Sequence, residues 1–136
     1  MILSQEAAST TLAALTSDLG ANPSLVIYSG TVPAGPDTAL SGNTALVSGG
    51  ISSWGTPTYN ASTSGMSSSG TFTASGYSPA ASGTATFARL ITSGSVAREQ
   101  LTVGTSGAEV ILGNTTILTG TTVEMSMQLT IPSQSV

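Results

Sequence analysis

The most constraining feature of the sequence is a strict alternation of apolar and polar residues over positions 121–132. The apolar positions are Val123, Met125, Met127, Leu129 and Ile131, and the polar positions between them include Glu124 and Gln128. A period of two is typical of a β-strand, because successive side chains point to opposite faces. We therefore expect a strand with one core face and one face toward water or a partner. Pro132 has no backbone N–H and ends the strand.

Other short apolar runs, separated by Gly, Pro, Ser and Asn, predict further strands. These runs are residues 25–28, 45–47, 51–54, 71–73, 83–92, 95–103, 110–112 and 117–118. Residues 31–37 contain two prolines and predict an ordered loop, whereas residues 62–70 hold mostly small side chains and predict a loop rather than an edge strand. About eight to ten strands favour an all-β fold, an antiparallel β-sandwich or jelly roll with one N-terminal helix.

Residues 4–19 are the one stretch with a helical pattern. Ser4 can cap the first turn, and Glu6 complements the positive end of the helix dipole. An apolar stripe is formed by Ala8, Leu12, Leu15 and Leu19. This stripe packs either on the sheet of the same chain or on a neighbouring subunit, and the sequence leaves both interpretations open.

The chain length of 136 residues allows one domain with a single core. We expect an N-terminal helix or arm over residues 1–22 and a single β-sandwich domain over residues 23–136. Only 6% of the residues are charged, against about a quarter in a typical isolated domain. The sequence therefore predicts a surface that is largely neutral or covered by partners.

Residues 83–92 are apolar at both odd and even positions, which predicts a central strand with both faces covered. Arg89 lies within this strand, and a buried charge must reach water or find a partner. Arg98 and Glu99 are adjacent, so in an extended strand they point to opposite faces, and either is a candidate partner for Arg89 or for a neighbouring subunit. Trp54, the only tryptophan, is expected to anchor the core or an interface.

The charge balance excludes several classes of partner. Two arginines, no lysine and six acidic residues give a net charge of −4. Binding to nucleic acid or to anionic membranes needs several cations, so neither is expected as a partner. The sequence has no cysteine, no basic start of a secretory signal and no apolar run near the ~20 residues of a membrane span. We expect the protein to be made in a cytoplasm.

The residue types needed for most enzyme chemistry are absent. The chain has no histidine, the usual general base, and no lysine for Schiff-base or phosphate chemistry. The carboxylates are scattered over Glu6, Asp18, Asp37, Glu99, Glu109 and Glu124. We therefore expect no enzymatic activity, no catalytic residues, no metal site and no cofactor.

A series of motifs resembles a group of small virion proteins encoded by tailed bacteriophages and prophages. The motifs are LVIYSGTVPA at residues 25–34, LSGNT at 40–44, GTATFARL at 83–90, VGTSGA at 103–108 and the final strand that ends in proline. They consist of turn glycines and core strands, and the likeness is weakest over residues 59–82. The resemblance implies a component of the virus particle without catalytic residues.

The resemblance leads us to expect a capsid decoration or cement protein that contacts the major capsid protein and forms a homo-oligomer, with a trimer as the expected form. A surface with few charges suits this role, because few ions would lose water in the lattice. The alternatives are a tail or neck protein and a receptor- or glycan-binding module of a tail fibre. The candidate interface or structural residues are Leu12, Leu15, Leu19, Trp54, Arg89, Arg98 and Glu124.

Overall fold

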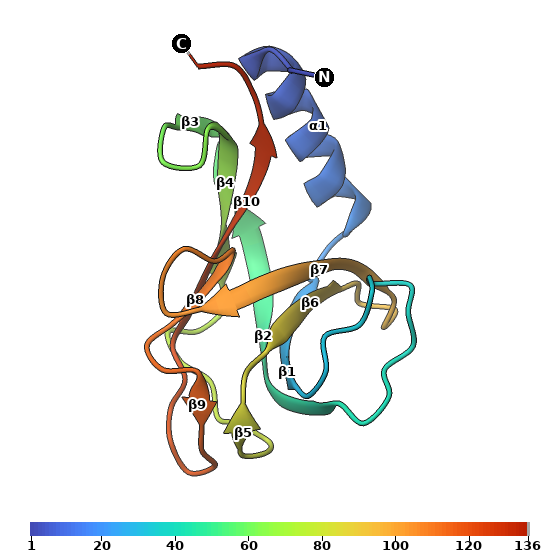
Figure 1. Ribbon diagram of the computed structural model, residues 1–136, viewed down its shortest axis with the longest axis vertical. Helices are drawn as coiled ribbons and strands as arrows, with labels where there is room; N and C mark the ends of the chain where they lie inside the picture. The colour runs from blue at the N-terminus through green and yellow to red at the C-terminus, as the bar shows by residue number, and fades with distance from the viewer. Residues whose placement is uncertain (136) are drawn as a thin grey trace.

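The computed structural model describes residues 1–135, which form one helix and ten strands (Figure 1). In chain order these are α1 (Gln5–Asp18), β1 (Ser24–Ser29), β2 (Thr44–Trp54), β3 (Thr58–Asn60), β4 (Gly65–Phe72), β5 (Gly83–Thr84), β6 (Phe87–Ile91), β7 (Ala97–Gly104), β8 (Val110–Leu112), β9 (Thr116–Ile117) and β10 (Met125–Pro132). The expected all-β class with an N-terminal helix is confirmed.

The large sheet closes on itself. Its strand order is β10-β8-β7-β6-β1-β2-β4-β3, and β10 also pairs with β4. The β10–β4 pairing closes seven of the eight strands into a ring. The eighth strand, β3, pairs only with β4 and lies outside this ring. An odd number of strands cannot alternate in direction all the way round, and β7 and β8 form the parallel pair that this closure requires. The expected sandwich or jelly roll is not confirmed, since β10 continues from β8 to β4 without a break between two sheets.

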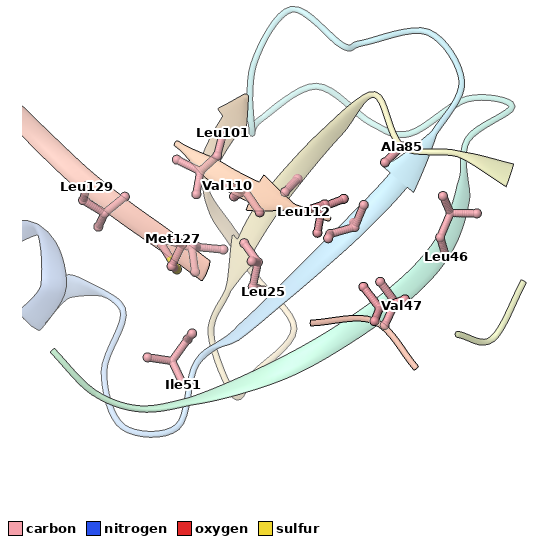
Figure 2. Close-up of a cluster of buried hydrophobic side chains, with 14 of the residues drawn as sticks. Leu25, Leu46, Val47, Ile51, Ala85, Leu101, Val110, Leu112, Met127 and Leu129 are labelled. Atoms are coloured by element: carbon pink, nitrogen blue, oxygen red, sulfur yellow. The ribbon is translucent and has the colours of Figure 1, made fainter. Parts of the chain in front are cut away.

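One buried cluster fills the ring, and Figure 2 shows its side chains converging from opposite strands. It includes Leu25, Leu46, Ile51, Leu90, Leu101, Val110, Leu112, Met127 and Leu129. Met127 and Leu129 come from the final strand, so the predicted facing of that strand is confirmed. Burial of apolar side chains of this kind is the main favourable term in folding.

The helix belongs to the same core. The Ser4 side chain accepts a hydrogen bond from the N–H of Ala7 at 3.1 Å, which confirms the predicted cap. Leu12 and Leu19 are buried within the cluster, and Leu15 packs against it half-buried. The helix lies against β4 and β10, with both chain termini at the same end of the molecule (Figure 1). The apolar stripe therefore packs on the sheet of its own chain.

The expected loop at residues 62–70 is wrong, because most of this segment belongs to β4. The strand pairs with β2, β3 and β10, and residues 65–68 are buried. Gly65 shows the physical reason for the small side chains: a Cβ there would lie 2.5 Å from the carbonyl oxygen of Ile131. The small residues allow β4 to lie between its neighbours and beneath the helix.

Two other strand boundaries differ from expectation. The runs at 45–47 and 51–54 form one continuous strand, β2, because Gly49 makes room for the side chains of Met125 and Tyr77 instead of making a turn. Residues 83–92 are divided between β5, which pairs with β9, and β6, which pairs with β1 and β7. The central position of β6 is confirmed, and β6 forms an antiparallel hairpin with β7.

Candidate functional site

The connection between β1 and β2, residues 30–43, is a long loop that the buried guanidinium of Arg89 holds in place. Arg89 lies on β6 with 4% of its surface exposed. Its Nη2 donates to the carbonyl oxygens of Gly35 at 3.0 Å and Thr38 at 2.7 Å, and its Nε donates to Oε1 of Gln100 at 3.2 Å. We call residues 30–43 the β1–β2 loop.

Uncharged side chains complete the anchoring of this loop. Gln100 on β7 donates to the carbonyl oxygen of Pro33 at 2.7 Å. Asn43 donates to the carbonyl oxygens of Ser29 and Thr31 at the base of the loop, at 3.0 and 2.9 Å. The carbonyl groups of a loop otherwise need water as a partner, so these contacts give the loop a defined shape on the scaffold.

Arg89 has no acidic partner among residues 1–135. The one ion pair there joins Arg98 to Asp18. Carbonyl dipoles and the ring of Phe87, whose centre lies 5.9 Å from the guanidinium carbon, replace the water that Arg89 loses. Phe87 in turn stacks on Tyr28 at 5.1 Å. Burial raises the pKa of the Tyr28 hydroxyl, and the positive charge of Arg89 acts in the opposite direction.

The outer side of the β1–β2 loop presents apolar side chains to the surroundings. Val32 is 51% exposed and Leu40 is 40% exposed. Asp37, the one charged residue of the loop, is exposed as well. The side chains that anchor the loop thus lie on its inner side, and Val32, Leu40 and Asp37 are exposed.

Arg98 and Glu99 do not approach Arg89 as partners. Arg98 donates from Nη2 to Oδ1 of Asp18 at 2.9 Å, which links β7 to the end of α1. Glu99 is half-buried and has a carboxylate oxygen without a hydrogen-bond partner. The partner that sequence reasoning missed is Gln100, because an uncharged polar residue on a strand carries no distinctive signal.

Trp54 is half-buried at the end of β2, where it packs against the core cluster. It lines a groove of about 280 Å³ together with Leu12, Ala13 and Thr16 of α1. Trp54 therefore contacts the core without being fully buried, and a role as an interface anchor stays a prediction.

Glu124 is exposed between β9 and β10, beside a hollow of about 430 Å³ that Ile117, Leu118 and Val123 also line. One carboxylate without a second titratable group makes no acid–base pair there. Over residues 1–135, no cluster of acidic residues could hold a metal ion. No helix within the same residues is long and apolar enough to cross a membrane.

Comparison of the chain with known proteins found no matching family model, no matching curated protein and no matching solved structure.

Proposed function

We propose that the protein is a non-enzymatic structural component of a bacteriophage virion, a capsid decoration or cement protein that contacts the major capsid protein as a homo-oligomer. The observation that carries the proposal is the β1–β2 loop, which the buried Arg89 holds in one shape with Val32 and Leu40 exposed. Two of the motifs that resemble small virion proteins belong to this feature. Residues 25–34 contain the start of the loop, and residues 83–90 contain Arg89.

A loop that is ordered before binding lowers the cost of association. Ordering a flexible loop during binding reduces affinity, and a loop already held in its bound shape avoids that cost. The loop presents one charge, Asp37, so a partner would desolvate few ions on contact. A pre-ordered and partly apolar surface with one charge suits a repeated contact with another protein better than it suits a substrate.

The first test is imaging of intact virus particles with the number of copies counted against the major capsid protein. A decoration protein gives copies spread over the shell in a fixed ratio to that protein. A small number of copies in a ring would contradict the capsid assignment and support a tail or neck protein. Copies at a fibre tip would support the receptor- or glycan-binding alternative.

The second test asks whether the β1–β2 loop makes the contact. Val32→Asp should raise the concentration needed for half-occupancy of undecorated particles at least about tenfold, which corresponds to about 1.4 kcal/mol. Val96→Asp is the matched control, because Val96 has the same 51% exposure and lies in the β6–β7 turn. Equal occupancy of the two variants, with normal melting of both, would exclude this loop as the contact surface.

A further inference from the structure

Glu99 lies on β7 next to Arg98, whose guanidinium contacts Asp18 at the end of the helix. One of its carboxylate oxygens, Oε2, is buried and accepts no hydrogen bond from the described residues. A buried carboxylate without a donor is costly when ionised, whereas the protonated acid carries no charge. The arrangement of Glu99 thus favours its neutral form.

A β-bulge brings the neighbouring Arg98 toward the helix. Leu90 pairs with Glu99 and Ile91 pairs with Ala97, so Arg98 is the extra residue on β7. Bulges change the direction of side chains, and here Arg98 reaches Asp18, the last residue of α1. This ion pair and the buried Leu19 connect the carboxyl end of the helix to the barrel.

Three charged side chains from three parts of the chain surround Glu99. Asp18 comes from α1, Arg98 from β7, and Glu109 from the segment before β8. Glu109 is held in place, since its Oε1 accepts from the N–H of Thr102 at 3.2 Å. Burial raises the pKa of Glu99 to about 7, and the negative charges of Glu109 and Asp18 act in the same direction.

We propose that Glu99 makes the docking of the carboxyl end of α1 on the barrel dependent on pH, with the neutral acid holding the helix end in place and the carboxylate loosening it. Ionisation places a third negative charge beside Asp18 and Glu109 and leaves a buried oxygen anion without a donor. Opening of the helix end exposes Glu99 to water and separates it from Asp18. The inference concerns the fold itself and does not depend on the proposed function.

The sign of the effect follows from the two states of Glu99. Its pKa is about 7 in the docked state and near the ordinary value of 4.5 when exposed. The contribution to docking is therefore fully present below about pH 4.5 and is lost as the pH rises to about 7. Between these limits opening releases one proton, so the opening constant rises by up to about tenfold per pH unit. Above about pH 7 it levels off.

Amide hydrogen exchange on the full chain between pH 5 and 8.5, corrected for the intrinsic exchange rate, measures this opening. The amides in the last two turns of α1 should open about fortyfold more at pH 7 than at pH 5, given a pKa of about 7 when docked and 4.5 when exposed. The fluorescence of Trp54, which borders the helix, should follow the same transition. The opening of the β6 amides should not change with pH in the same way. If it does, the pH effect is on global unfolding and the inference is overturned.

Three variants and one direct titration complete the test. Glu99→Gln should abolish the pH response, and Asp18→Asn should lower its midpoint because one negative charge is removed. Glu6→Gln, at the exposed opposite end of α1, should keep the response. Carbon NMR of the Glu99 side chain in the unmodified protein should titrate near pH 7. Titration near pH 4.5, or a pH response that survives in Glu99→Gln, would overturn the proposal.

Discussion

The guanidinium of Arg89 donates to the carbonyl oxygen of Thr38, 51 residues earlier in the chain, at 2.7 Å. This contact joins a central barrel strand to the middle of the β1–β2 loop. It also satisfies a buried cation with backbone dipoles and without an acidic side chain. The stability of the loop and the solvation of the charge therefore depend on the same bonds.

Arg89→Ala should reduce the free energy of unfolding by about 2–4 kcal/mol. The substitution leaves the carbonyl oxygens of Gly35 and Thr38 and the Gln100 side chain without their donor, and it removes packing against Phe87. Urea denaturation measures the loss.

Arg98→Ala is the matched control for this arginine. Its ion pair with Asp18 is about half exposed, at 45% and 49%, so the loss should be below about 1 kcal/mol. Equal losses for Arg89→Ala and Arg98→Ala would contradict the structural role of the buried cation.

Leu12→Ala should cost about 2–5 kcal/mol, because Leu12 is completely buried between the helix and the sheet. Leu15→Ala should cost less than about 2 kcal/mol, since Leu15 is half-buried. Thermal and urea unfolding would rank the two variants. A larger loss at Leu15 would mean that the helix presents a different face to the barrel.

Met127→Asp should prevent folding, because Met127 is 3% exposed and its replacement puts a carboxylate into the core. The adjacent Ser126 faces outward, and Ser126→Asp should remain within about 1 kcal/mol of the original stability. Circular dichroism and melting temperature provide the measurement. Normal melting of Met127→Asp would show that the final strand is turned the other way.

Gly65→Ala should destabilise the protein by about 2 kcal/mol or more. The added Cβ would lie 2.5 Å from the Ile131 carbonyl oxygen, and this backbone atom cannot move without disturbing the β4–β10 pairing. Gly113→Ala is the control, because a Cβ there meets nothing within 4 Å. It should be neutral or stabilising by up to about 1 kcal/mol. Similar behaviour of both variants would argue against the close approach of β4 and β10.

Local sequence patterns were sufficient to predict the elements in which buried and exposed side chains alternate with a regular period. The alternation around Met127 specifies a strand and its buried face, because the backbone of a strand sends successive side chains to opposite sides. The spacing of Leu12 and Leu19 specifies a helix with one apolar stripe for the equivalent reason. The sequence also placed a buried cation, Arg89, in a central strand.

The tertiary structure decided how these elements close into one body. Gly49 and Gly65 read as turn or loop residues, yet each lies within a strand where a neighbour occupies the space of the missing side chain. The partners of Arg89, the bulge at Arg98 and the buried oxygen of Glu99 likewise depend on groups distant in sequence. Periodicity is a property of the local backbone, whereas strand pairing, close approach and charge compensation arise only when distant segments pack together.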